Sequence, residues 1–366
     1  MASTAPPLRH HSAAAAPPPP TITCVKQLAE SANLTSIIPS NYAYFTNSAE
    51  TKASEPGDSI PIIDLSLLTS DNPDHKSTAI RDLDNACRDW GFFMVVNHGI
   101  PEELMSGILE GARDFFDLPE EEKPEFQPKD VLRPIRYGTS FNTEKEKIFC
   151  WRDFLKVFVH PDFNCPDKPE SLRKLMVEYR ERCGDVVTEL LKGVSKSLGL
   201  DEGEMEAGLG MASTLQIFTA NLYPRCPNPD AAVGMPPHSD HGLFTLLIQN
   251  GVGGLQIQHN GSWINANALP NSILVNTGDH LEIFSNGKYK SVLHRAVVND
   301  QRTRISVAMA NGPSRDTVVC PAPELVRAEG CVPVYVPIKY EDYLLAQQSN
   351  QLDGKSILKR VRIDED

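Results

Sequence analysis

The sequence lacks any apolar run that could cross a membrane. No stretch reaches the roughly 18 apolar residues that a transmembrane helix needs. Basic residues are also in the minority, because 35 lysines and arginines stand against 48 acidic residues and give a formal net charge of −13. Phosphate backbones bind to basic surfaces, so this balance argues against a general nucleic-acid binder. We therefore expect neither a membrane nor a nucleic acid as a partner.

The sequence also lacks a disulfide pattern. Its eight cysteines are scattered, no C-x-x-C pair occurs, and no secretory apolar segment stands at the N-terminus. We interpret the cysteines as reduced thiols in the cytoplasm, with access to the nucleus left open. The leader is rich in Ala, Ser and Pro and has no acidic residue before Glu30, as in plastid transit peptides. Only Arg9 and Lys26 are basic in that stretch, so plastid targeting is not the interpretation we favour.

What is present is an ordinary globular composition, 40% hydrophobic and 23% charged, in a chain long enough for a large core. An alanine tract followed by four prolines predicts a disordered low-complexity tail over residues 1–22. Residues 23–213 predict helices and strands that pack on a barrel. From Thr214 short apolar stretches alternate with turn signals every 8–12 residues, so 214–345 predicts a barrel or sandwich of short strands. Residues 346–366 predict a C-terminal tail or helix, and we expect a monomer.

Within the first region, hydrophobic periodicity predicts individual elements. The expected strands are 60–65 and 92–96, and the expected helices are 25–32, 76–89, 101–116 and 171–198. Together with the strands after Thr214, these elements indicate an α+β fold that is mainly β.

A candidate metal centre occurs in the run Pro237-His-Ser-Asp-His-Gly242. Residues two apart on a strand point to the same face, so His238 and Asp240 could reach one metal ion together. His294, in a second β-branched run, supplies a third donor. Two histidines and one carboxylate form the facial triad of non-haem Fe(II) oxygenases, although histidine and aspartate also bind zinc.

A candidate carboxylate clamp follows ten residues after His294. Arg304 presents a planar fork that matches a carboxylate, and Ser306 adds a hydroxyl on the same strand face. Asn221 and Tyr223 repeat the same parity on an earlier strand. For His294 and Arg304 to face inward in one hairpin, the turn between them must contain an odd number of residues, with 299–301 as the expected turn.

These residues belong to a longer set of segments that resembles the plant 2-oxoglutarate-dependent dioxygenases of specialised metabolism. That family includes flavanone 3-hydroxylase, anthocyanidin synthase and the downy-mildew-resistance oxygenases. The matching segments extend from about residue 60 to residue 343 and include IPIIDL (60–65), WGFFMVVNHGI (90–100), FFDLPEEEK (115–123), WRDFL (151–155), NLYPRCPNP (221–229), PHSDHG (237–242), IFSNGKYKSVLHRAVVN (283–299) and RIS (304–306).

The resemblance implies a distorted double-stranded β-helix, or jelly roll, with surrounding helices. It implies Fe(II) at His238, Asp240 and His294, and 2-oxoglutarate at Arg304 and Ser306 with help from Tyr223 and Asn221. Dioxygen is then a co-substrate and ascorbate the reductant. The implied reaction is hydroxylation, desaturation or demethylation of a flavonoid, phenolic or terpenoid, coupled to decarboxylation of 2-oxoglutarate to succinate. By the same comparison, His98 and His241 are interpreted as not being ligands.

Strand parity extends the expected cavity to a substrate pocket. The candidate lining residues are Phe154, Lys156, Phe158, Thr219, Ala308, Ala310 and Gly312. Relatives resembling anthocyanidin synthase carry an aromatic and an acidic residue at the last two positions, so this pocket is expected to be roomier. Lys156 could meet a substrate carboxylate, although an exposed lysine is the interpretation we favour for it.

Two other function classes are open to the sequence alone. A zinc hydrolase on a similar barrel would need a base near the metal and would have no use for the Arg304 and Ser306 pair. A non-catalytic small-molecule receptor would be expected to have lost a metal ligand, whereas all three are present.

Overall fold

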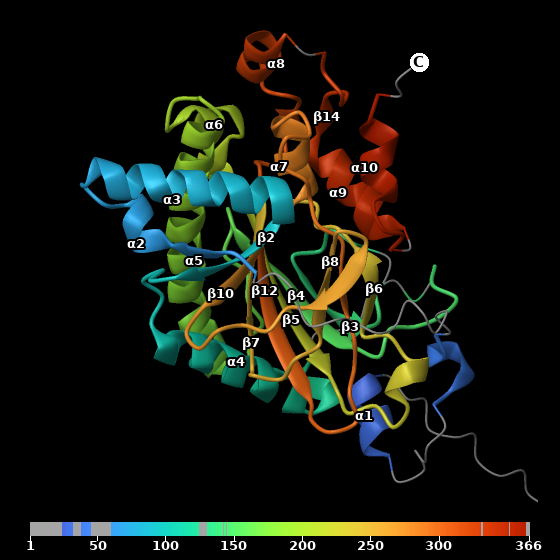
Figure 1. Ribbon diagram of the computed structural model, residues 1–366. Coiled ribbons are helices and arrows are strands. Elements are labelled where there is room, and N and C mark those ends of the chain that lie inside the picture. Colours follow the sequence, from blue (N-terminus) through green and yellow to red (C-terminus); the bar gives the residue numbers. More distant parts are fainter. Residues whose placement is uncertain are drawn as a thin grey trace, which may run out of the picture.

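The computed structural model describes residues 24–31, 38–44, 60–123, 130–141, 143, 145–330, 332–350 and 352–363. The low-complexity tail expected at 1–22 lies outside the described residues. Within the described ranges, β-sheets form the centre of the molecule and helices surround them (Figure 1).

The large sheet has eight strands among these residues, and all neighbours except β1 and β2 are antiparallel. In sheet order they are β1 (Ile62–Asp64), β2 (Phe92–Val96), β10 (Ile273–Thr277), β7 (Phe244–Gln249), β12 (Arg304–Gly312), β5 (Leu215–Tyr223), β4 (Asp153–His160) and β3 (Ile135–Thr139). Half of these strands precede Thr214, so the boundary drawn there from the sequence does not bound the sheet.

The small sheet contains β6 (Met235–His238), β11 (His294–Ala296), β8 (Leu255–His259) and β9 (Ser262–Asn265), in that order. A short pair, β13 (Val318–Val319) and β14 (Ile338–Lys339), lies apart from both sheets. Short, mainly antiparallel strands in two sheets confirm the expected α+β jelly-roll fold.

Helices cover the outer side of the large sheet and the ends of the strands (Figure 1). They are α1 (Val25–Glu30), α2 (Leu65–Leu68), α3 (Pro73–Asn85), α4 (Glu102–Asp117), α5 (Glu170–Ser197), α6 (Glu204–Gly208), α7 (Asp279–Phe284), α8 (Pro323–Glu329), α9 (Tyr340–Ser349) and α10 (Ser356–Val361). In α5 the fully buried Leu172, Met176, Tyr179 and Cys183 recur at helical spacing and pack into the main core. No described helix is both long enough and apolar enough to cross a membrane.

Strand register places the expected site residues in rows on one face of the large sheet. Cα partners share a face, and positions two apart along a strand return to it. From β12 outward the rows are Arg304–Tyr223, then Ser306–Asn221–Phe154, then Ala308–Thr219–Lys156–Arg136.

The expected hairpin between His294 and Arg304 is wrong. β11 pairs with β6 and β8 in the small sheet, whereas β12 pairs with β5 and β7 in the large sheet. The chain therefore passes from one sheet to the other between residues 296 and 304. The number of residues in a turn then does not determine whether His294 and Arg304 face the same cavity.

Candidate metal centre and active-site cavity

Three polar side chains converge at one end of the small sheet. His238 ends β6, Asp240 lies two residues later, and His294 begins β11 directly opposite His238. Their donor atoms all lie within 4.8 Å of one another. Asp240 Oδ1 is 3.8 Å from His238 Nε2 and 3.7 Å from His294 Nε2. The structure thus brings together the three residues that the sequence predicts as metal ligands.

Hydrogen bonds orient these three donors. In each histidine, Nδ1 faces the carbonyl oxygen of the residue two positions earlier, at 2.9 Å for His238 and 3.3 Å for His294. A carbonyl oxygen only accepts, so Nδ1 carries the proton and Nε2 keeps its lone pair. Asn276 donates to Asp240 Oδ2 at 2.9 Å, which leaves Oδ1 beside the two imidazoles. This donor set suits a divalent transition metal.

Electrostatics favour the metal-binding protonation states. Burial, together with the neighbouring His294, lowers the pKa of His238 to about 3. Burial alone would raise the pKa of Asp240, but the two imidazoles and hydrogen bonds from Thr245 and Asn276 hold it below its usual range. At neutral pH His238 is therefore neutral and Asp240 is ionised, and these are the forms that bind a metal ion.

Arg304 lies in the same cavity, on β12 of the large sheet. Only 1% of the residue is exposed. Its Nη1 donates to Ser306 Oγ at 3.3 Å and its Nη2 to Gln249 Oε1 at 3.0 Å, while the guanidinium lies 5.0 Å from the centre of the Tyr223 ring. Its Nε has no hydrogen-bond partner among the described residues. A buried guanidinium with only neutral partners and an unused donor is prepared for an anion.

The cavity between these two groups fits Fe(II) and 2-oxoglutarate. A 2-oxo dicarboxylate has a chelating end for the metal and a far carboxylate for Arg304. Asp240 is the only carboxylate among the described residues that line the cavity. The lining therefore offers no second carboxylate as the base that a zinc hydrolase would need.

Five of the seven expected substrate-pocket residues line this cavity, namely Phe154, Lys156, Thr219, Ala308 and Ala310. Lys156 differs from the exposed lysine that we favoured, because it is only 7% exposed and its Nζ donates to Gln348 at 2.6 Å. Its partner belongs to α9, which returns over the cavity from the C-terminal part of the chain.

Phe158 and Gly312 do not line the cavity, and their assignment to the pocket is wrong. Phe158 packs in a separate apolar cluster with Tyr340 of α9. At Gly312 a side chain would collide with the ring and hydroxyl of the same Tyr340. That hydroxyl lies 2.8 Å from Nδ1 of His241, which lines the cavity but is outside the three-residue donor cluster. Helix α9 therefore occupies the space beside Phe158 and Gly312, which strand parity alone assigned to the cavity.

Some lining residues were not predicted from the sequence. They include Arg136, Phe141, Arg152, Met235, Asn276, Gln347, Gln348 and Leu352. Arg152 had a usable signal, because it precedes Phe154 and Lys156 at a spacing of two. The others come from strand pairing and from the returning C-terminal segment, which no local pattern shows. His98 lies elsewhere, as interpreted, and its Nε2 faces the carbonyl of Asn271 at 3.2 Å.

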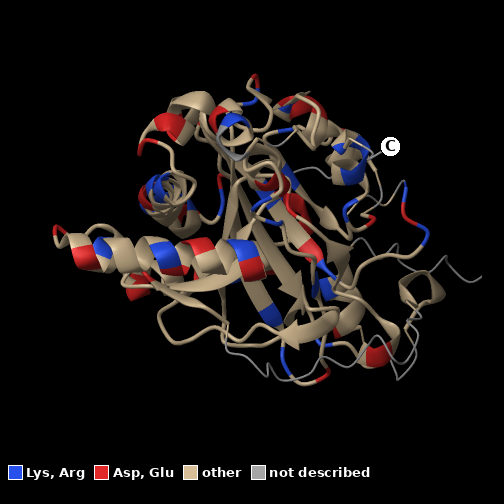
Figure 2. Ribbon diagram, turned by 45° about the horizontal axis from the view of Figure 1, so that its top comes forward, with Lys and Arg blue, Asp and Glu red and all other residues tan. Residues whose placement is uncertain are grey.

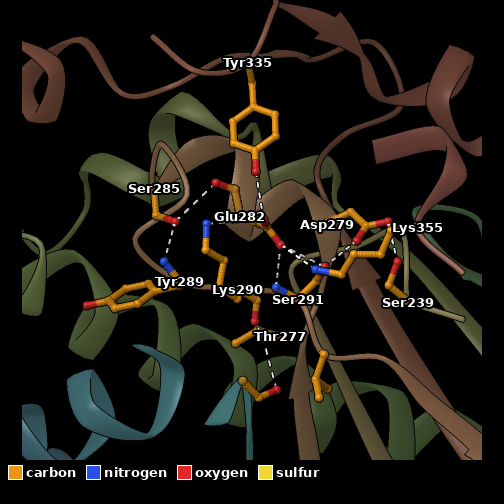
Figure 3. A network of polar contacts seen from close by, with 12 residues as sticks. Ser239, Thr277, Asp279, Glu282, Ser285, Tyr289, Lys290, Ser291, Tyr335 and Lys355 are labelled. Atoms are coloured by element: carbon orange, nitrogen blue, oxygen red, sulfur yellow. Dashed lines mark hydrogen bonds and ion pairs between the residues drawn. The ribbon is translucent and has the colours of Figure 1, made fainter. Parts of the chain in front are cut away.

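A buried polar network links α7 to the C-terminal segment (Figure 3). Glu282 accepts hydrogen bonds from the hydroxyl of Tyr335 at 2.7 Å, the backbone N–H of Ser291 at 2.8 Å and Nζ of Lys355 at 2.9 Å. Burial would raise the pKa of Glu282, but Lys355 and these hydrogen bonds hold it below its usual value. The negative charge of Glu282 is thus compensated by three hydrogen-bond donors, one of which is the ammonium group of Lys355.

Asp279 extends this network to the metal-binding loop (Figure 3). Its carboxylate accepts hydrogen bonds from Ser239 at 3.1 Å, Ser291 at 2.6 Å and Tyr343 at 2.7 Å. Its backbone N–H donates to the carbonyl of Asp240 at 2.7 Å. The network therefore fixes the backbone on which one metal-binding carboxylate stands.

Replacing Glu282 with glutamine is expected to destabilise the protein by about 1–3 kcal/mol, because Lys355 loses its buried anionic partner. A lowered carboxyl pKa stabilises the fold above the unfolded value, here 4.5, and this contribution is lost as the pH falls through the folded pKa. The difference in unfolding free energy between the wild type and E282Q should therefore be largest near neutral pH and shrink below about pH 4.5. Denaturant unfolding at several pH values measures it.

The control is E170Q, at an exposed ion pair with Lys174 on α5. This variant should stay close to the wild type at every pH, because solvent screens the exposed pair and leaves it little effect on stability. A constant difference between wild type and E282Q across the acidic range would show that Glu282 does not carry the assigned charge.

Family models and relatives agree with this geometry. A model of the 2OG-Fe(II) oxygenase superfamily matches residues 214–313, and a model of the N-terminal region of non-haem dioxygenases, named for morphine synthesis, matches 60–178. The chain is 45% identical to 2-oxoglutarate-dependent dioxygenase 19 of Oryza sativa subsp. japonica, over 89% of this chain and 97% of the relative. It is 40% identical to DMR6-LIKE OXYGENASE 2 of Arabidopsis thaliana, over 90% and 96%.

A solved structure shows the same fold. The crystal structure of JOX2 in complex with 2OG, Fe and JA superposes with a TM-score of 0.83 at 32% identity, over 94% of this chain and 98% of that one. These matches confirm the resemblance found in the sequence, including its branch, since flavanone 3-dioxygenase 2 of Oryza sativa subsp. japonica is 37% identical over 83% of this chain. The chain therefore belongs to the plant 2-oxoglutarate-Fe(II) dioxygenases and is an enzyme that uses Fe(II) and 2-oxoglutarate.

Proposed function

We propose that this dioxygenase hydroxylates a small specialised plant metabolite, such as a flavonoid, phenolic or terpenoid, with desaturation or demethylation as other outcomes of the same chemistry. We propose His238, Asp240 and His294 as the iron ligands, and Arg304 and Ser306 as the residues that bind the far carboxylate of 2-oxoglutarate. The observation that carries the proposal is that they line one cavity, with three metal donors converging from the small sheet and the loop after β6, and a buried guanidinium without a carboxylate partner on the large sheet.

The protein's own side chains position the metal ligand Asp240 and the guanidinium that binds the co-substrate. When bound, the iron supplies oxygen activation coupled to the conversion of 2-oxoglutarate to succinate and carbon dioxide. Asn276 fixes the orientation of Asp240, and the ring of Tyr223 supports the guanidinium of Arg304. Asn221 accepts a hydrogen bond from Arg152 at 3.1 Å and lies in register with Ser306, so its amide nitrogen can assist at the same carboxylate. These contacts set the two ends of the co-substrate before the prime substrate enters.

The lining supports a small organic substrate. Thr219, Ala308 and Ala310 present short side chains in the middle of the cavity, while Phe154 and Leu247 present apolar surface. Relatives carry names such as flavanone 3-dioxygenase and leucoanthocyanidin dioxygenase, and a structural relative is described as a dioxygenase for auxin oxidation. Plant metabolites with a ring system are therefore the class that we favour. A cytoplasmic location agrees with the described cysteines, none of which forms a disulfide.

The function is tested by following succinate from purified protein supplied with Fe(II), 2-oxoglutarate, ascorbate and air, together with flavanones, phenolic acids or diterpenoids. Succinate release should require Fe(II) and 2-oxoglutarate and should rise when a substrate is present. Failure of every compound to raise it, together with hydrolysis supported by zinc, would contradict the proposal. A strong preference for flavanones would contradict the open pocket at Ala308 and Ala310.

A further inference from the structure

Three buried cations line one end of the cavity. Arg136, Arg152 and Lys156 are 7%, 3% and 7% exposed. Arg136 and Lys156 are Cα partners on β3 and β4, so two positive side chains stand directly opposite each other on one face. Arg152 precedes Lys156 on the same face of the chain. Figure 2 shows basic positions, drawn in blue, on strands inside the fold as well as on the outer helices.

The partners of these three cations are all neutral. Lys156 Nζ donates to the amide oxygen of Gln348 at 2.6 Å, and Arg136 reaches only the carbonyl of Val131 at 3.5 Å. Arg152 donates to the carbonyl of Ser140, and its further contacts are with an amide oxygen and a thioether sulfur. None of the three makes an ion pair with a carboxylate of the described residues.

Both arginines also lie against one aromatic ring. The guanidinium carbons of Arg136 and Arg152 are 5.7 Å and 5.0 Å from the centre of the Phe154 ring. An aromatic face attracts a cation but does not neutralise it. Burial and the two neighbouring arginines hold the pKa of Lys156 well below its usual range, so the cluster carries a repulsion that an anion would relieve.

Two buried carboxylates elsewhere in the described chain are compensated. Glu282 pairs with Lys355, and Asp153 accepts hydrogen bonds from Thr139 and from the first backbone N–H groups of α1. Arg304 is likewise buried with neutral partners, and the co-substrate explains it, whereas Arg295 donates to Gln256 Oε1 at 2.8 Å and lies 4.1 Å from the centre of the Trp263 ring. Several unpaired like charges in one cavity cost folding stability, so the cluster has the character of a second anion site.

We propose that the prime substrate carries a carboxylate, and that Arg136 and Lys156, with Arg152 beside them, bind it. This inference rests on the proposed function and specifies its substrate class. The row Arg136–Lys156–Thr219–Ala308 runs from the cations toward the centre of the sheet. From β4 to β12 it crosses two strand spacings, about 10 Å, and the side chains in the middle are small. The substrate is therefore an acid with an apolar body that lies over Thr219 and Ala308.

The planar guanidinium forks and the apolar lining favour a carboxylate on an organic body. The same features distinguish this site from the co-substrate site, because Arg304 lies in another row of the sheet, next to Ser306. Excess 2-oxoglutarate should therefore not displace the substrate acid.

The test compares acids with their uncharged methyl esters. Benzoate, 4-coumarate, 1-naphthaleneacetate and abietate, each with its ester, are titrated anaerobically into the protein loaded with Fe(II) and 2-oxoglutarate. The visible absorption of the Fe(II)–2-oxoglutarate chelate reports each binding event and shows independently that the metal and co-substrate sites work. At least one acid should bind about tenfold or more tightly than its ester, because the ester leaves the buried cations unpaired. In K156M and R136M this preference should be lost.

Thermal unfolding of the ligand-free protein separates a ligand site from a structural role. K156M removes an unpaired buried cation at similar volume, so its melting temperature should equal or exceed that of the wild type. The exposed Lys174 on α5 provides the control variant K174M, which should keep both stability and acid preference.

Two results would overturn the proposal while leaving the proposed function standing. One is equal binding of acids and esters, or binding of none of the acids, by a protein that still forms the chelate. The other is a K156M protein with a lowered melting temperature and an unchanged acid preference. Absence of the chelate absorption itself would instead contradict the proposed function.

Discussion

Replacing Asp240 with asparagine is expected to lower succinate formation by more than about a hundredfold. Loss of groups that only orient a metal ligand already costs about 10–100-fold, and Asp240 is proposed as a ligand itself. Asp240 Oδ1 is the atom that both His238 Nε2 and His294 Nε2 approach, at 3.8 and 3.7 Å. An amide is neutral and binds Fe(II) weakly, so the two imidazoles would be left as an incomplete donor set.

The measurement is iron content per chain together with succinate release under saturating 2-oxoglutarate. The exposed Asp230 gives the control D230N, which should retain full iron and activity. A D240N protein that keeps full iron and more than a tenth of wild-type turnover would exclude Asp240 as an iron ligand.

Replacing Arg304 with lysine is expected to raise the KM for 2-oxoglutarate by about thirtyfold or more. Loss of one partner in a buried, hydrogen-bonded charge pair costs about 2–5 kcal/mol, and every 1.4 kcal/mol is a factor of ten. Lysine keeps the charge but not the planar fork that Ser306 and Gln249 orient, so even this conservative change should be severe.

Iron binding should stay at the wild-type level in R304K, because Arg304 belongs to the large sheet and the proposed metal ligands to the small sheet and the loop after β6. The exposed Arg302, two residues earlier, gives the control R302K, whose KM should not change. A KM within about threefold of the wild type in R304K would show that Arg304 does not bind the co-substrate.

Much of the candidate site could be predicted because its residues are close in sequence or share strand parity. His238 and Asp240 are two residues apart, as are Arg304 and Ser306, and the short period of a strand places each pair on one side. Asn221 and Tyr223 were placed by the same parity, and the register puts them directly opposite Ser306 and Arg304. The types of these residues then pointed to metal and carboxylate chemistry.

The remaining features depend on contacts between distant parts of the chain. The parity that placed Ala308 and Ala310 correctly failed at Gly312, because Tyr340 of α9 occupies the space beside it. Lys156 is covered by Gln348 of the same helix, so its burial could not be predicted from its own strand. Arg136 reaches the cavity only because β3 pairs with β4.

The polar network of α7 shows the same limit. Glu282 directly precedes a segment that the resemblance marked, but its partners Tyr335 and Lys355 are 53 and 73 residues away along the chain. The network has a mechanical consequence, since Asp279 connects it to the backbone of Asp240. Changes in the C-terminal segment are therefore expected to affect metal binding through the position of this loop.

The cavity is proposed to bind 2-oxoglutarate at both ends, through iron on one side and Arg304 on the other. An anaerobic titration of 2-oxoglutarate into the Fe(II)-loaded protein tests this binding mode most directly, with the visible absorption of the chelate as the signal. We predict one chelate per chain in the wild type, no chelate in D240N, and in R304K a chelate that forms only at much higher 2-oxoglutarate concentration. Equal titration curves for the three proteins, or a wild type that binds 2-oxoglutarate equally well without iron, would contradict the account.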